Sequence, residues 1–269
     1  MKVGLSSLAW EPAQDDLVQA ALVRRGVEGI ELAPMKYWPS APDVPRHQLA
    51  EFRARWTDAG ISIIALQAIL FGKPELQLFG SDEQRTALEH FLVGMTSLAG
   101  TLGATVLVLG APKNRLRHDL PETAAIASAA PLLRRIAVAA VDHGCVLCVE
   151  PNPARYGGDF VGTSEEAMRL VHAVDHPGFG LHLDAGALAI NAESDEQILR
   201  AAPHARHFHV SEIDLRPIGD GTVDHRRLAE LLRRARFQGW CSIEMRPIPP
   251  GALAETIDRA LDVTLDSYG

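Results

Sequence analysis

The sequence predicts an α/β protein folded as a single (β/α)8 barrel, or TIM barrel, over residues 1–269. Short apolar or β-branched segments alternate with longer amphipathic ones along the whole chain. This alternation is typical of a parallel sheet joined by helical crossovers. Eight such pairs are present, and eight is the number that closes a barrel. No stretch rich in Pro, Gly or Ser divides the chain, so we expect one domain.

The predicted strands and helices follow one another in strict alternation. Apolar and β-branched residues mark the strands, which we expect at residues 3–9, 29–33, 62–69, 105–110, 146–150, 180–184, 207–211 and 241–245. Amphipathic periodicity marks the helices, which we expect at residues 15–25, 47–59, 82–102, 122–142, 164–173, 195–201, 224–234 and 253–265.

Local signals agree with these boundaries and with a closed barrel. Thr163 offers an N-cap hydroxyl ahead of Glu165 and Glu166 in a first turn. Glycines follow four of the predicted helices, where a left-handed residue commonly ends a helix. The alternative, an open doubly wound sheet, predicts a Gly-rich turn after the first strand. Residues 9–12 read Ala-Trp-Glu-Pro instead, which favours the barrel.

Composition excludes several functional classes. Apolar residues make up 47% of the chain and charged residues 22%, as in ordinary globular proteins. The formal net charge of −8 disfavours nucleic acid as a partner. No uninterrupted apolar run is long enough to predict a membrane span, and the N-terminal segment does not resemble a secretory leader, so we expect a cytoplasmic protein. Cys145 and Cys148 point to opposite faces of a predicted strand, which argues against a C-x-x-C clamp.

Ionisable side chains end four consecutive predicted strands. Glu150, Asp184, His209 and Glu244 stand at these ends among apolar or neutral neighbours. Catalytic groups of such barrels lie at the carboxyl ends of the strands. Three carboxylates at one barrel mouth would repel one another, and a bound divalent cation relieves that repulsion. Three carboxylate oxygens and one imidazole nitrogen suit Mn²⁺, Mg²⁺ or Co²⁺, and Zn²⁺ is compatible too. The alternative is that each acid pairs with an Arg or caps a helix.

These segments resemble the xylose-isomerase-like TIM barrels of the sugar isomerase/epimerase group, which includes ketose 3-epimerases, hydroxypyruvate isomerases and inosose dehydratases. The resemblance covers nearly the whole chain, and it is most specific at residues 148–150, 182–184, 207–209 and 242–244 and at the glycine turn 219–224. It implies that Glu150, Asp184, His209 and Glu244 bind one divalent metal ion, with Mn²⁺ expected first. It also implies that Glu150 and Glu244 are the catalytic acid/base pair.

The implied chemistry is proton transfer next to a carbonyl group. A divalent ion stabilises the developing enediolate, and two carboxylates remove and return the proton. The expected activity is therefore that of a metal-dependent isomerase or epimerase acting on a sugar or keto-polyol. Alternatives are a keto-polyol dehydratase, which eliminates a β-hydroxyl group, and a non-catalytic sugar-binding barrel. An endonuclease-like phosphodiesterase would need further His ligands and a basic surface. The family also implies a homodimer or a homotetramer.

Two positions depart from the family pattern. Many members place a substrate-binding His three residues after the strand-six Asp, and Ala187 stands there in this chain. Members often carry an Arg in the loop after the strand-seven His. Arg216 lies nearby, but a register shift of one residue would place Leu215 there instead. We therefore expect substrate recognition to differ from that of free-ketose epimerases.

Several other residues are predicted at the barrel mouth. Substrate-binding candidates are Asn152, Lys113, Arg216, Arg246 and His182. For His182 we favour orienting a ligand carboxylate over the role of an ordinary interior His. Lys113 and Arg115 flank an Asn in a loop that could bind a phosphate or carboxylate. Weaker candidates are a supporting role for Glu31, a substrate contact for Gln67, a lid that includes Tyr156 and Asp159, and pocket walls formed by Trp10, Trp38 and Phe71.

Overall fold

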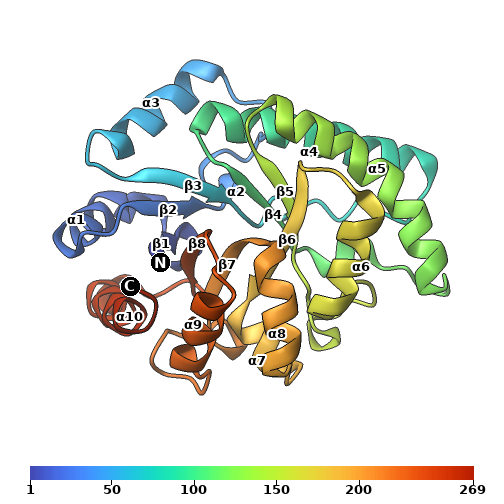
Figure 1. Cartoon of the computed structure of the whole chain (residues 1–269). Helices are drawn as coiled ribbons and strands as arrows, with labels where there is room; N and C mark the ends of the chain where they lie inside the picture. The colour runs from blue at the N-terminus through green and yellow to red at the C-terminus, as the bar shows by residue number, and fades with distance from the viewer.

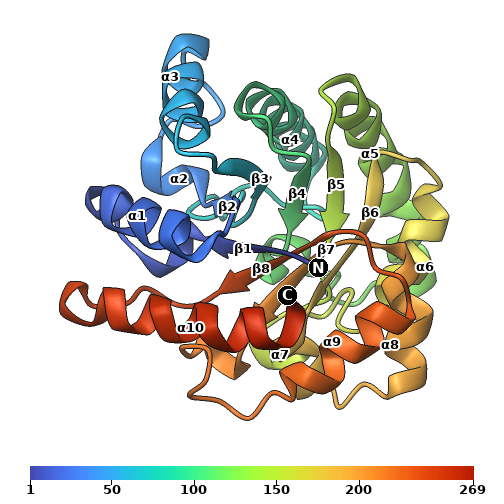
Figure 2. The ribbon, with the colours of Figure 1, turned by 60° about the vertical axis from the view of Figure 1, so that its left-hand side comes forward.

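A computed structural model describes residues 1–269 as a closed barrel of eight parallel strands, ordered β1 to β8 around the ring. Helices surround the strands, and the two chain ends lie close together (Figures 1 and 2). The amino group of Met1 donates a hydrogen bond to the carbonyl of Tyr268 at 2.7 Å. The predicted (β/α)8 fold is confirmed.

The strands occupy the predicted places, and the helices form the outer ring. The strands are β1 (Lys2–Ser6), β2 (Gly29–Leu32), β3 (Ser62–Leu66), β4 (Val106–Leu109), β5 (Val146–Val149), β6 (Phe179–Asp184), β7 (Ala205–Ser211) and β8 (Trp240–Glu244). The helices are α1 (Asp15–Arg25), α2 (Pro34–Tyr37), α3 (Arg46–Thr57), α4 (Asp82–Leu102), α5 (Glu122–Asp142), α6 (Ser164–Val174), α7 (Ala185–Ile190), α8 (Asp195–Ala201), α9 (His225–Arg234) and α10 (Leu253–Tyr268).

Two strands, β1 and β3, end three residues earlier than predicted, and two helices were not predicted. β1 ends where Ser6 caps a 3-10 turn by accepting the N–H of Leu8. β3 ends before Ala68, whose positive φ of 50° takes the chain out of the sheet. The short helices α2 and α7 follow β2 and β6 almost directly. No loop signal in the sequence separates them from these strands, so they were not predicted.

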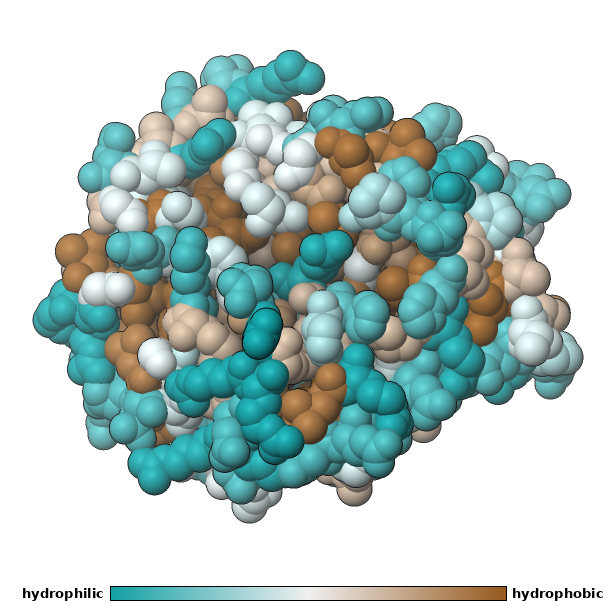
Figure 3. Space-filling model, in the orientation of Figure 1, coloured by the Kyte–Doolittle hydropathy of each residue, from teal (hydrophilic) through white to brown (hydrophobic).

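The barrel interior divides into an apolar half and a polar half. Ile64, Val106, Val108 and Cys148 pack together inside β3 to β5. The polar half, inside β6, β7 and β2, contains the buried side chains of His182, His207 and Glu31. A larger apolar core fills the space between the strands and the helices. The face shown in Figure 3 is mostly hydrophilic, with scattered apolar side chains.

One helix is long and apolar enough to cross a membrane, judged by length and composition only. This helix is α5, with a mean hydropathy of 1.6. It lies in the outer ring between α4 and α6 and packs on β5 (Figure 1). Its buried side, with Leu133, Ile136 and Ala137, belongs to the main core. Burial against the barrel therefore accounts for its composition.

The cysteines are all free and buried. Cys145 belongs to the core beneath the helices, whereas Cys148 points into the barrel with Ile64 and Val108. The two thiols thus lie on opposite sides of the sheet, as predicted.

Candidate metal centre

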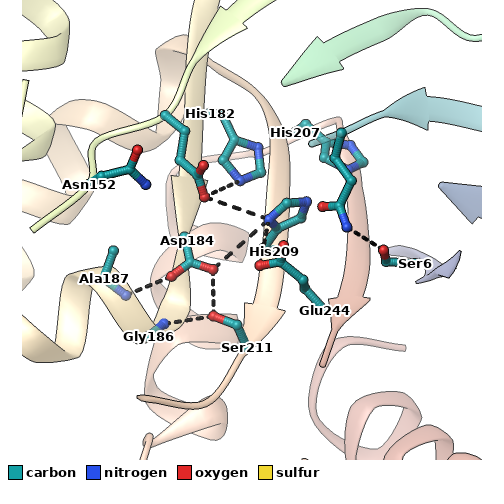
Figure 4. A network of polar contacts seen from close by, with 12 residues as sticks. Ser6, Asn152, His182, Asp184, Gly186, Ala187, His207, His209, Ser211 and Glu244 are labelled. Carbon is teal, nitrogen blue, oxygen red and sulfur yellow. Dashed lines mark hydrogen bonds and ion pairs between the residues drawn. The ribbon is translucent and has the colours of Figure 1, made fainter. Parts of the chain in front are cut away.

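Four side chains from neighbouring strands converge at the barrel mouth (Figure 4). Glu150 follows β5, Asp184 ends β6, His209 lies in β7 and Glu244 ends β8. Nδ1 of His209 is 3.2 Å from Oε2 of Glu244, 3.8 Å from Oε1 of Glu150 and 4.0 Å from Oδ2 of Asp184. Ligand atoms of the four residues all lie within 4.8 Å of one another. The structure therefore brings the predicted quartet together.

Strand alternation explains why these side chains meet. In β7, His207, His209 and Ser211 point into the barrel, while Phe208 and Val210 point to the helices. The ring of Phe208 packs against that of Tyr268 at 5.8 Å between centroids. Burial of the outward-facing apolar set fixes the register, and the imidazole of His209 is thereby held at the mouth.

Asp184 has a second role as the N-cap of α7. Its Oδ1 accepts the N–H of Ala187 at 2.6 Å, and its Oδ2 accepts the hydroxyl of Ser211. Oγ of Ser211 in turn accepts the N–H of Gly186 at 2.9 Å. Helix capping, one of the two alternatives to metal binding, thus holds for Asp184. It does not account for Glu150 and Glu244, neither of which caps a helix or pairs with an Arg.

Glu31 orients the imidazole of His209 from below. Its Oε2 is 3.0 Å from Nε2 of His209 and 3.3 Å from Nε2 of His207. All three side chains are fully buried. Because the carboxylate of Glu31 accepts Nε2–H, Nδ1 is the ring nitrogen that faces the three carboxylates, and it would carry the lone pair for a metal ion in the neutral imidazole. The supporting role predicted for Glu31 matches this position.

The cluster is electrostatically unfavourable without a cation. Burial, reinforced by the carboxylates of Glu244 and Glu150, raises the pKa of Asp184 to about 7. Burial also raises the pKa of Glu244. Burial alone would lower the pKa of His209, but the carboxylates of Glu31 and Glu244 outweigh it and hold that pKa well above its ordinary value. Burial and neighbouring like charges explain the raised pKa values of the two acids, and the opposite charges of the carboxylates explain the raised pKa of His209.

A divalent ion fits this donor set. Nδ1 of His209 is buried and makes no hydrogen bond, although three carboxylates surround it. Ligand atoms bonded to one ion at about 2.1 Å lie roughly 3–4 Å apart, which matches the distances of 3.2, 3.8 and 4.0 Å from Nδ1 of His209 to the three carboxylates. Glu150 and Glu244 keep 13% and 12% of their side chains exposed, so the site opens toward the mouth.

His182 lies directly beneath Glu150. Its Nε2 is 3.8 Å from Oε1 of Glu150, and its ring centroid is 4.1 Å from that of His209. The side chain is fully buried and does not line the cavity. Of the two roles predicted for His182, this position supports orienting a ligand carboxylate and does not support contact with a substrate.

The carboxylate of Glu150 depends on two neighbours that the sequence did not reveal. A Cβ atom at Gly110 would lie 2.3 Å from Oε2 of Glu150, so any side chain there would displace this carboxylate. Arg115 is buried and donates to the carbonyls of Glu150 and Phe160 and to Oδ1 of Asn152. The expectation that Arg115 binds a phosphate or carboxylate is therefore wrong, because backbone carbonyls already occupy its guanidinium group.

An open cavity of about 560 Å³ lies above the quartet. Its lining includes the predicted substrate-binding residues Asn152 and Lys113, together with Gln67, Tyr156 and Phe71. Tyr156 lies where the loops after β5 and β7 meet. Its neighbour Arg155 joins the two loops through a 2.6 Å ion pair with Asp214. Lys113 is the only Lys or Arg in the lining and forms no ion pair.

The structure does not bring the other predicted contacts to the cavity. Arg216 and Arg246 are exposed and lie outside the lining. Leu215 lines the cavity instead of Arg216, because positive φ angles at Asp214 and Leu215 turn the chain there. Of the two positions considered for this contact, the structure therefore places Leu215 at the cavity and Arg216 outside it.

The remaining weaker candidates have structural roles. Asp159 accepts the backbone N–H groups of Arg117 and His118. Trp10 is fully buried, and Trp38 packs on the ring of Phe52. No direct sequence signal marked Gly110 or Ser211 as parts of the site.

Replacement of Glu31 by glutamine is expected to weaken metal binding by about 10- to 100-fold, as is common for groups that orient a metal-binding His. Glutamine keeps the volume of the side chain but no longer fixes Nε2–H of both imidazoles. Calorimetric titration with Mn²⁺ measures the change, with circular dichroism as a check on folding. An unchanged affinity in a folded variant would contradict this role.

The fold and the site define a (β/α)8 barrel whose mouth carries a candidate divalent-metal centre. A family model described as "Xylose isomerase-like TIM barrel" matches residues 19–263. The chain belongs to this family.

Curated and solved relatives agree with this membership. A ketose 3-epimerase of Arthrobacter globiformis is 30% identical over 154 residues, 56% of this chain and 53% of that protein. The match thus spans about half the length of the curated relative. Among solved structures, D-psicose 3-epimerase of Clostridium cellulolyticum H10, solved with D-tagatose, has a TM-score of 0.84 at 18% identity and covers 100% of this chain and 99% of its own.

Two further structures share the fold. The 3-keto-D-glucoside 4-epimerase of E. coli has a TM-score of 0.78 at 17% identity, with 97% of this chain and 98% of that chain covered. The IOLI protein, solved with a zinc atom, has a TM-score of 0.76 at 20% identity, with 100% and 98% covered. At these identities the likeness establishes the fold.

Proposed function

We propose that this chain is a divalent-metal-dependent epimerase or isomerase of a sugar or keto-polyol. One observation carries the proposal. A buried Nδ1 atom of His209 without a hydrogen-bond partner faces three carboxylates at the floor of an open cavity. Mn²⁺ is the ion that we expect first, because the set has three carboxylate oxygens and a single nitrogen. Mg²⁺, Co²⁺ and Zn²⁺ are its competitors.

The chain's own residues supply the proton transfers. Glu150 and Glu244 reach the centre from β5 and β8, with Asp184 and His209 on the strands between them. They therefore approach a substrate carbon from two sides. In one direction Glu150 removes the proton next to the carbonyl, and Glu244, whose pKa burial raises, returns one on the opposite side. When bound, the ion stabilises the charge that develops on the carbonyl oxygen.

Solvent exchange tests the proposal. The metal content is measured by elemental analysis, and the protein with Mn²⁺ is incubated in D₂O with D-fructose, D-psicose, D-tagatose and keto-glycosides. We expect deuterium at a carbon next to the carbonyl, read by NMR. An inverted centre indicates epimerisation, and transfer to the neighbouring carbon indicates isomerisation. A product that absorbs in the ultraviolet indicates dehydration instead. A metal-loaded protein that exchanges none of these substrates would contradict the proposal.

A further inference from the structure

The outer wall of the cavity is apolar, in contrast to its floor. Beyond the quartet, the loop after β3 supplies Ala68, Ile69, Leu70 and Phe71 to the lining. Leu215 from the loop after β7 joins them, and Ala111 and Pro112 follow β4. None of these side chains can donate or accept a hydrogen bond. The floor of the cavity is therefore polar, and the wall formed by Phe71 and Leu215 is apolar. Lys113, Asn114, Tyr156 and Asp214 are the other polar residues of the lining.

Phe71 is held at this wall in an exposed position. Its side chain is 74% exposed, more than that of any other large apolar residue in the chain. It stacks on no other aromatic ring. The loop that carries it is nevertheless anchored, because Ile69 and Leu70 are buried in the main core. The ring thus lines the cavity at a fixed place and leaves most of its apolar surface exposed.

The Asn114 side chain reinforces this anchor. Its amide group donates to the carbonyls of Lys73 and Leu76, both at 2.7 Å, just after the Phe71 turn. Gly72, with a φ of 73°, closes that turn. A buried amide from a different loop therefore holds the segment in place, as expected of a wall built to receive a ligand.

Polar groups for a sugar are concentrated near the floor. Oε1 of Gln67 is buried without a partner, and the amide nitrogen of Asn152 makes no hydrogen bond within the chain. Farther out, Leu215 lines the cavity, and the exposed Arg216 lies outside the lining. Hydroxyl groups buried against Phe71 and Leu215 would lose water without gaining a hydrogen-bond partner from these side chains, which costs free energy.

We propose that the substrate is a keto sugar with an apolar, preferably aromatic, O-linked substituent that packs on Phe71 and Leu215. The sugar lies on the floor against Gln67 and Asn152, and the substituent fills the outer half of the cavity. The physiological ligand is thus a glycoside of a keto sugar rather than a free ketose. The reaction of this glycoside rests on the proposed function. Its binding rests only on the apolar wall formed by Phe71 and Leu215.

Matched substrates test the inference. Solvent deuterium exchange is measured for the methyl and the phenyl glycosides of 3-keto-D-glucose and for D-fructose. We expect kcat/KM for the phenyl glycoside to exceed that for the methyl glycoside by about tenfold or more, since one aromatic ring leaves water. Phe71→Ala should abolish this preference by raising KM for the phenyl glycoside. Phe71→Tyr should keep the preference, and Leu215→Arg should reduce it. Leu17→Ala, an exposed apolar residue on α1, is the control.

Several results would overturn the inference. These are equal kcat/KM for the two glycosides, a free ketose as the best substrate, or a Phe71→Ala effect shared by both glycosides. A change of oligomeric state in Phe71→Ala, measured by light scattering, would show that a second copy of the chain covers the ring. If nothing exchanges, the proposed function fails, and calorimetry with unreactive phenyl and methyl β-D-glucosides still decides the binding claim.

Discussion

Glu150→Gln and Glu244→Gln are each expected to lower the rate of solvent deuterium exchange by at least about 10²- to 10⁴-fold, the usual contribution of a general acid or base. Glutamine has nearly the same shape as glutamate but cannot accept and return a proton. Both side chains are partly exposed at the mouth, so the replacements leave the core intact. The exchange rate is measured on the best substrate of the panel, with Mn²⁺ at saturation.

Metal content separates the two roles of these glutamates. Each substitution removes a metal ligand as well as a proton carrier, so bound Mn²⁺ is measured in parallel. Exchange that stays low in a metal-saturated variant indicates lost proton transfer. Glu230→Gln on α9 removes the same charge from an exposed position without an ion pair, and it should leave the rate within a few-fold. Wild-type exchange in either metal-saturated active-site variant would refute the acid/base assignment.

The barrel and the quartet could be predicted because both follow from short-range patterns. Two periods, one for strands and one for helices, repeat along the chain and define the fold. Each of the strands β5 to β8 finishes with an ionisable residue that points inward, and this places its side chain at the barrel mouth. Glu150, Asp184, His209 and Glu244 meet because neighbouring parallel strands end at the same level. No long-range information beyond the strand order is needed for that.

The cavity walls could not be predicted in the same way. Arg115 looks like a solvated loop cation in the sequence, but it is buried by carbonyl groups from a loop 35–46 residues away. Leu215 rather than Arg216 faces the cavity because of two consecutive left-handed residues, neither of which is glycine. These outcomes depend on how loops pack on one another, and hydrophobic periodicity carries no signal for them.

Asp184→Asn is expected to stabilise the metal-free protein and to destabilise the metal-bound one. Asparagine still caps α7 through its side-chain oxygen, in place of the Oδ1 that accepts the N–H of Ala187. It removes one buried negative charge from beside Glu150 and Glu244. We expect the unfolding temperature of the metal-free variant to rise by a few degrees, since about 1 kcal/mol is worth roughly 2–4 °C in a protein of this size.

The pH dependence of this difference follows from the raised pKa of Asp184. In the metal-free folded protein the carboxyl has a pKa of about 7, against an ordinary value of 3.8. The folded state therefore keeps a proton that the unfolded state releases, and stability falls as the pH rises from about 4 to 7. The variant lacks this group, so its advantage should be small near pH 4 and largest above pH 7. An advantage that shrinks with rising pH would contradict the assignment.

With Mn²⁺ bound, the wild-type protein should be more stable than Asp184→Asn, the reverse of the order without the ion. The ion requires the ionised carboxylate, so wild-type affinity increases as the pH rises through about 7. At an ion concentration of about 100 times Kd, binding adds about 2.7 kcal/mol to wild-type stability, while the variant has lost a ligand and gains less. Thermal unfolding with and without Mn²⁺ at pH 8 measures both effects. If the carboxylates were merely structural, Asp184→Asn would change stability equally in the two conditions. A reversal would mean that the same repulsion that weakens the metal-free fold gives the barrel mouth its affinity for a cation.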